Sequence, residues 1–292
     1  METVKEISIA AASQRYWKTT RSKNTLVRVL LRALEQAGIR RDSSVLVLGG
    51  GNIDVVLLET VGLTNFTLSN MTSSALARTD RQDAGALLDA ENLGLPDNSF
   101  DVVFAHDVLH HCYTPHKAVR EMMRVAKQCV IFFDPNDSAF MRALIRLKFS
   151  FPYEIGIVAA LDYAGGGVMG SAIPNYVFRW TPRELEKTAR CSMPGRIIKT
   201  LGYPYWDFLV TKEGLELRRE TRIGKITSLV GADNFIRGLR FGQWLLNLWG
   251  PLRSQGNKFC GLVVKEGFHP WMTEDGTALS RDWYAGKARR SA

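Results

Sequence analysis

The sequence predicts an α/β protein built around a mostly parallel sheet with helices on both faces. An apolar run at 45–48 leads directly into Gly49-Gly50-Gly51, which is typical of a strand and loop that bind a nucleotide-type cofactor. Two further buried runs, 100–105 and 129–133, are separated by a stretch of helical spacing. Strands that alternate with helices across short loops pair in parallel, so a doubly wound sheet is expected.

The order of the remaining elements follows from hydrophobic spacing and from capping residues. Thr114 and Pro115 predict a helix start, because threonine favours the cap position and proline the first turn. Thr181 and Glu184 predict a second start through a capping box. The other expected elements are helices at 24–38 and 54–60, a poor helical stretch at 72–84, and strands at 65–69, 85–89, 196–200 and 258–264.

Two long stretches interrupt this alternation and are too long for ordinary connections, which indicates a functional role. We therefore expect a three-part chain. It has an N-terminal helical cap at 1–42, a main domain at 43–267 with insertions at 138–180 and 206–256 that form a substrate cap, and a tail at 268–292.

Composition limits the class of protein. The 292 residues carry a net charge of +9, but the basic residues are dispersed, which favours a solvated basic surface. The four cysteines are far apart and form no CxxC pair, so we expect no metal site and no disulfide framework. We see no signal peptide pattern and no spanning apolar run, and expect a cytoplasmic protein.

A set of short motifs occurs in a fixed order after the first strand. Asp-Ala-Glu-Asn-Leu begins at Asp89, Pro-Asp-Asn-Ser-Phe-Asp begins at Pro96, and Leu-His-His begins at Leu109. With the glycine loop, this set over 43–136 resembles the class I S-adenosylmethionine-dependent methyltransferases of the small-molecule type. The resemblance implies a Rossmann-like, doubly wound, seven-stranded and mostly parallel sheet with helical insertions. It also implies an enzyme that uses S-adenosyl-L-methionine.

The resemblance assigns cofactor-binding roles to residues at the carboxyl ends of the strands. The glycines would let the backbone approach the methionine portion, Asn70 would hold the ribose and Met71 would pack on the adenine. Asp89 would accept a hydrogen bond from the adenine amino group. The implied cofactor-binding residues are Gly49, Gly50, Gly51, Asn70, Met71, Asp89, Ala90 and His106.

Three positions depart from the family pattern. Val47 and Asn70 stand where acidic residues are common, and Ile53 stands where a further glycine is common. An amide forms a weaker bond to a ribose hydroxyl than a carboxylate does. These departures motivate one alternative, a binding or scaffold protein with a lapsed cofactor site. A nicotinamide-dependent oxidoreductase is a second alternative, but the loop does not supply the GxGxxG spacing.

Polar side chains follow the strand at 100–105 and are candidates for catalysis. We predict catalytic roles for Asp107, His110 and His111, since a histidine can act as a base near neutral pH. Packing at a helix start is the alternative for the two histidines. A base favours a hydroxyl acceptor, so transfer of the methyl group to oxygen is the first hypothesis.

The insertions carry the candidates for recognition of the acceptor. We predict substrate contacts by Glu154, Tyr176 and Arg179 and a lid hinge at 165–167. The acceptor is expected to be a sugar, a natural product or a lipid-linked precursor. Nucleic acid is not expected, because the Asn/Asp-Pro-Pro-Tyr/Phe motif is absent after strand 100–105. The apolar and basic stretch 236–246 leaves a weak membrane contact, a helical cap and a homodimer contact open.

Overall fold

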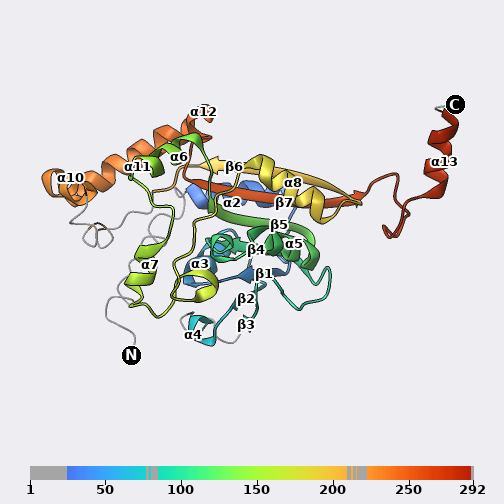
Figure 1. Ribbon diagram of the computed structural model, residues 1–292, viewed down its shortest axis with the longest axis horizontal. Coiled ribbons are helices and arrows are strands. Elements are labelled where there is room, and N and C mark those ends of the chain that lie inside the picture. Colours follow the sequence, from blue (N-terminus) through green and yellow to red (C-terminus); the bar gives the residue numbers. More distant parts are fainter. Residues whose placement is uncertain are drawn as a thin grey trace.

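The computed structural model describes residues 25–76, 79, 85–208, 212, 215 and 222–290 (Figure 1). A seven-stranded sheet has the order β3-β2-β1-β4-β5-β7-β6. β7 runs antiparallel to β5 and β6, and the other neighbouring strands are parallel. The predicted doubly wound, mostly parallel sheet is thereby confirmed. The strands are β1 (Val45–Leu48), β2 (Phe66–Asn70), β3 (Gly85–Leu87), β4 (Phe100–His106), β5 (Ala126–Pro135), β6 (Arg196–Tyr205) and β7 (Lys258–Phe268).

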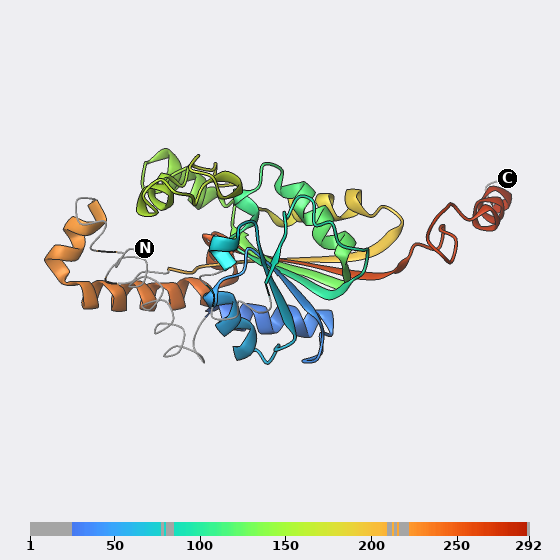
Figure 2. The same cartoon turned by 90° about the horizontal axis from the view of Figure 1, so that it is seen from below.

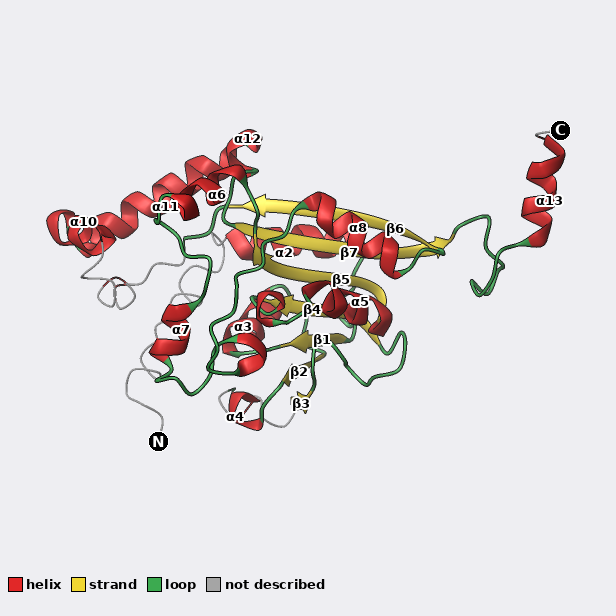
Figure 3. Ribbon diagram, in the orientation of Figure 1, coloured by secondary structure: helices red, strands yellow, loops and turns green. Residues whose placement is uncertain are grey.

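Helices cover both faces of this sheet (Figures 2 and 3). Most of the predicted starts and ends lie within two residues of the observed ones. The helices are α2 (Thr25–Ala37), α3 (Asn52–Thr60), α4 (Ser73–Leu76), α5 (Pro115–Val125), α6 (Ala139–Arg146), α7 (Ile155–Ala160), α8 (Pro182–Ser192), α10 (Arg222–Val230), α11 (Ala232–Leu248), α12 (Gly250–Arg253) and α13 (Arg281–Arg290). Two short 3-10 turns are η2 (Leu109–His111) and η3 (Val168–Gly170).

Alternation along β1 divides the core into two layers. Val45 and Val47 pack with side chains of α2 and α3, whereas Leu46 and Leu48 pack with side chains of α5 and α8. All four are buried, because a strand covered on both faces has no solvent side. The continuous apolar run that predicted this strand therefore reflects its central place in the sheet.

Two local predictions differ in outcome. Thr181 caps α8 as predicted, since its hydroxyl oxygen accepts the backbone N–H of Glu184 at 3.1 Å. Thr114 occupies the cap position of α5, but its side chain makes no cap hydrogen bond, so that part of the prediction is wrong. Its backbone N–H instead donates to Glu91. Strands β5, β6 and β7 are longer than expected, because antiparallel pairing continues past their apolar centres.

The predicted insertions contain α6, α7 and η3 in the first and α10 to α12 in the second. Residues 1–24 of the predicted cap lie outside the described residues, and α2 packs directly against the core of the sheet. The division into cap, domain and tail stays a prediction. Among the described helices, none is both long enough and apolar enough to cross a membrane.

A buried carboxyl group lies just beyond β6. The amide side chain of Asn257 exchanges two hydrogen bonds with the backbone of Asp207, at 2.9 and 2.8 Å. Asp207 is 5% exposed, and burial is the main cause that raises the pKa of its carboxyl group to about 6. The nearby charges of Lys258 and His106 oppose this shift only in part.

The raised pKa of Asp207 makes the stability depend on pH. The folded carboxyl binds its proton more tightly than the unfolded one. Its contribution to the free energy of unfolding is therefore complete below about pH 4 and is lost as the pH rises to about 6. We expect Asp207→Asn to raise the free energy of unfolding at pH 7 by about 2 kcal/mol relative to the wild type. At pH 4 we expect little difference, and urea unfolding at both pH values measures it. An equal gain at both pH values would contradict this account.

Candidate functional site

A cavity of about 620 Å³ opens at the carboxyl ends of the parallel strands. Its wall is built from Gly49 after β1, the segment that follows β2, and Asp107 and Val108 after β4. Residues 161–170 of the first insertion, with the three glycines predicted as a lid hinge, line the cavity from another side. The size is that of a small-molecule site, and the location is the one expected for a ligand of an open α/β sheet.

The glycine loop packs so tightly against Val108 at Gly49 that it leaves no room for a side chain there. Gly49 has φ +60°, and a Cβ atom there would lie 2.5 Å from Cγ2 of Val108. Gly49 lines the cavity, whereas Gly50 and Gly51 do not. The Gly51 N–H donates to Asp54 Oδ2 at 2.8 Å, which anchors the loop to the first turn of α3. The loop therefore presents backbone to the cavity at Gly49 and is held from behind at Gly51.

Asp54 also connects this loop to β4. Its Oδ1 lies 2.9 Å from Nδ1 of His106, the last residue of that strand. Burial would lower the pKa of His106, but the hydrogen bond to Asp54 and the charges of Asp107 and Asp54 raise it. Asp54 was not among the predicted site residues. The signal that could have identified Asp54 is its place in the first turn of a helix, where an acidic side chain is favoured by the helix dipole.

Asp107 forms a partly buried ion pair across the sheet edge. Lys258 Nζ at the start of β7 lies 2.5 and 2.7 Å from its two carboxylate oxygens. Burial opposes ionisation, but the Lys258 charge holds the pKa of Asp107 well below its usual range. A carboxylate with so low a pKa is a poor proton acceptor, which suits Asp107 better to binding than to base catalysis. Lys258 was missed, since nothing in the local sequence distinguishes it.

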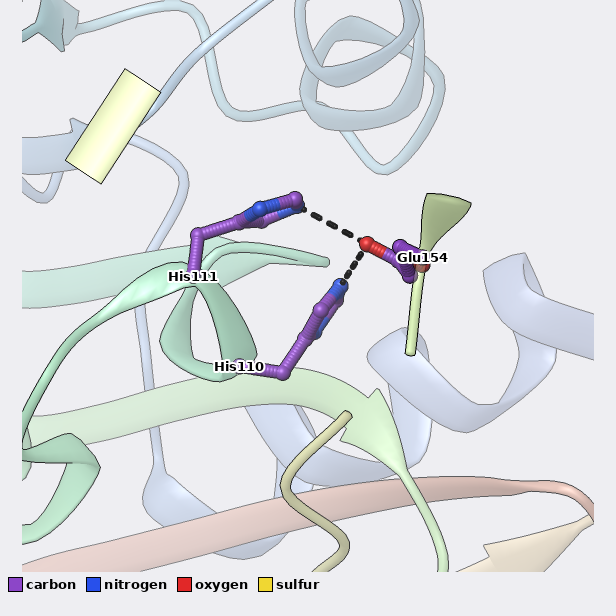
Figure 4. A group of neighbouring side chains, drawn as sticks. All are labelled: His110, His111 and Glu154. Carbon is purple, nitrogen blue, oxygen red and sulfur yellow. Dashed lines mark ion pairs between the residues drawn. The ribbon is translucent and has the colours of Figure 1, made fainter. Parts of the chain in front are cut away.

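The two predicted histidines and one predicted substrate residue lie together (Figure 4). Nε2 of His110 lies 3.4 Å from Oε2 of Glu154, and Nε2 of His111 lies 3.5 Å from the same oxygen. On its other side, His110 Nδ1 lies 2.6 Å from Oδ1 of the buried Asp134. Asp134 Oδ2 in turn accepts the indole N–H of Trp180 at 3.2 Å.

The fold of the first insertion brings Glu154 to the histidines. Its N–H donates to the carbonyl of Asn175 at 3.1 Å, and Val177 N–H donates to the carbonyl of Pro152 at 2.8 Å, which closes the base of the insertion. The Asn175 amide donates to the His110 carbonyl at 3.0 Å. Residues that are 44 positions apart in sequence thus meet at one point.

The two histidines differ in protonation. Burial would lower the pKa of His110, but Asp134 and Glu154 raise it to about 10, so this imidazole is charged at neutral pH. Burial and the charge of His110 lower the pKa of His111, which is neutral and lines the cavity. The donor atoms of His110, His111 and Glu154 lie within 4.8 Å of one another and are of types that can also bind a metal ion.

Several predicted residues lie near the cavity without lining it. Asp89 Oδ1 accepts the N–H of Glu91 at 2.8 Å, and only its neighbours Leu88 and Ala90 line the wall. Tyr176 is 58% exposed and packs on Tyr153. Arg179 donates to the carbonyls of Val177 and Phe151 and so holds the insertion together. His106 lies behind the wall. Asn70, Met71 and His111 do line it.

Comparison with known proteins finds one family model that matches part of the chain. Residues 46–133 match the model of a family described as a methyltransferase domain. This segment begins in β1 and ends in β5, and it contains the glycine loop and both histidines. No curated protein matches the chain in sequence.

Solved structures similar to this chain include three at low sequence identity. YcgJ from Bacillus subtilis is 16% identical, with a TM-score of 0.45 and coverage of 82% of this chain and 95% of that one. A SAM-dependent methyltransferase from Archaeoglobus fulgidus is 12% identical, with a TM-score of 0.44 and coverage of 86% and 98%. Magnesium protoporphyrin IX methyltransferase from Synechocystis, with bound SAH, is 11% identical, with a TM-score of 0.43 and coverage of 82% of each chain. The sequence match over residues 46–133 is thus to a methyltransferase domain, and the matched segment lies within the seven-stranded sheet.

Proposed function

We propose that the enzyme transfers the methyl group of S-adenosylmethionine to a hydroxyl group of a small molecule, such as a sugar, a natural product or a lipid-linked precursor. One observation carries the choice of oxygen. The neutral imidazole of His111 lines the same cavity as Gly49 of the glycine loop. A base at this place is useful for a hydroxyl acceptor, which must lose its proton during transfer.

The residues present fit the cofactor. Gly49 offers backbone at a point where Val108 leaves no room for a side chain, and Met71 is 41% exposed on the cavity wall. Asn70 and Ala90 line the same wall and would hold the ribose and adenine portions. The cofactor supplies a methyl group already activated on a sulfonium sulfur, so the protein has to orient the acceptor and exclude water.

His111 is assigned the role of proton acceptor at Nε2. Glu154 Oε2, at 3.5 Å from that nitrogen, would stabilise the imidazolium that forms. The charge of His110 keeps the pKa of His111 low, which favours release of the proton to solvent. Asp134 orients His110 through their 2.6 Å contact. Residues 161–170 would cover the reacting groups, and the ionised Asp107 would bind a polar group of cofactor or acceptor.

A binding protein with a lapsed cofactor site is the second candidate. The Oδ1 atom of Asn70 accepts the N–H of its neighbour Met71 at 2.9 Å, which occupies an oxygen that would otherwise accept a ribose hydroxyl. The remaining donor atoms of Asn70 can still serve. Calorimetry with S-adenosylmethionine and S-adenosylhomocysteine separates the two candidates, since the enzyme is expected to bind both. Absence of binding at millimolar concentration would support the lapsed site.

We expect Gly49→Ala to weaken cofactor binding about tenfold or more, because the added Cβ strains a left-handed residue and displaces Val108 at the cavity wall. Gly94→Ala is the matched control. Gly94 has φ +62°, but a Cβ there would meet nothing within 4 Å. Both variants should lose similar backbone stability, and only the first should lose affinity in calorimetry. Equal affinities for S-adenosylhomocysteine would contradict the placement of the cofactor at Gly49.

We expect His111→Gln to lower kcat about 100-fold or more with little change in cofactor affinity, because it removes the proton acceptor and keeps the fold. The control is His116→Gln, since His116 pairs with Glu184 at 3.2 Å outside the cavity. Formation of S-adenosylhomocysteine with a panel of hydroxyl and amine acceptors measures both variants. Turnover of amines alone, or an unchanged kcat in His111→Gln, would overturn the assignment to oxygen.

A further inference from the structure

The side of α11 that faces the protein is anchored by amide groups. Gln243 Oε1 accepts the N–H of Phe208 at 2.7 Å. Asn247 accepts the N–H of Trp206 at 2.9 Å and donates to the Trp206 carbonyl at 2.8 Å. The same side carries the half-buried Phe235, Ile236, Leu239 and Leu246, so α11 is apolar on both sides, whereas a surface helix normally has one apolar face. This 17-residue helix has no buried residue in the structure as described.

The opposite side of α11 is apolar, aromatic and basic. Phe241 is 61% exposed, Trp244 51%, Leu245 44% and Leu248 63%. With Arg237 and Arg240 they recur at intervals of three and four residues, so they form one stripe along the helix. The rings of Phe241 and Trp244 stack with centroids 5.8 Å apart. We call these six residues the α11 stripe.

Exposed apolar side chains continue on both sides of the α11 stripe. Leu229 in α10 is 85% exposed, Trp249 after α11 is 61% exposed and Leu252 in α12 is 40% exposed. Figures 1 and 2 show α10 and α11 extending away from the sheet. Single exposed apolar residues are ordinary, but a continuous set of this kind indicates a surface that another body covers.

The charge around the α11 stripe indicates which kind of partner covers it. From residue 224 to 253 the chain has four basic residues, Lys225, Arg237, Arg240 and Arg253, and one acidic residue, Asp233. Asp233 is paired with Lys212 at 2.8 Å, which further reduces its negative contribution. Tryptophan and leucine beside arginine are typical of helices that lie in the plane of an anionic bilayer surface.

We propose that α11 and α12 dock on a membrane that contains anionic lipid, with the α11 stripe inserted among the headgroups. The occupant is the lipid surface, because a partner of this chemistry complements both the apolar and the basic side chains. The proposal goes beyond methyl transfer and does not depend on it. The docking surface is close in sequence to the cavity. β7 begins five residues after α12, and its first residue, Lys258, holds Asp107 at the cavity wall.

The test is co-sedimentation of the full chain with vesicles of phosphatidylcholine, with and without phosphatidylglycerol. We expect binding to the anionic vesicles that weakens with added salt. Trp244→Glu combined with Leu248→Glu should reduce binding at least tenfold. Arg237→Gln combined with Arg240→Gln should reduce binding to anionic vesicles about tenfold or more, since each basic residue near the surface is worth about 1 kcal/mol.

Leu279→Glu is the control, because Leu279 is 52% exposed outside α10 to α12. It should bind anionic vesicles as the wild type does, and circular dichroism should show that all variants are folded. Wild-type protein that stays in the supernatant with anionic vesicles would overturn the proposal. So would an equal loss in Leu279→Glu. A concentration-dependent dimer that Trp244→Glu with Leu248→Glu dissociates, without vesicle binding, would assign the α11 stripe to a second copy instead.

Discussion

The buried pair of His110 and Asp134 is the interaction on which the site depends. Asp134 near the end of β5 is fully buried, and a buried carboxylate requires partners to offset its lost hydration. His110 supplies one partner and Trp180 the other, so β5, the turn after β4 and the end of the first insertion are fixed together. A change that removes His110 would leave the buried Asp134 without its counter-charge. The geometry of His111 and Glu154 follows from this arrangement.

Carboxylates pair with basic groups at the carboxyl edge of the sheet. Asp54 and His106 hold the glycine loop from behind, and Lys258 keeps Asp107 ionised at the wall. His110 is charged while its neighbour His111 is neutral. Of the two, only His111 is uncharged at neutral pH. Two adjacent residues of the same type acquire different chemistry because only one of them contacts the buried Asp134.

The two insertions contribute side chains that the strands of the sheet do not supply. The first supplies Glu154 to the histidines and residues 161–170 to the cavity wall. The second carries α11 and returns to the sheet at Lys258. Both insertions lie outside the matched family region of 46–133.

The parallel sheet, the glycine loop and the position of the histidines after β4 could be predicted from local sequence. These features depend on local periodicity and on which residue types favour turns and caps, both of which are properties of adjacent residues. The tertiary structure alone decided that Lys258 meets Asp107 across 151 positions and that Glu154 meets His110. Such contacts form between segments that are distant in sequence, so no local pattern predicts them. The same holds for α11. Its spacing predicts a helix, but only the tertiary structure decides that Phe241 and Leu248 are exposed while Gln243 bonds to the backbone.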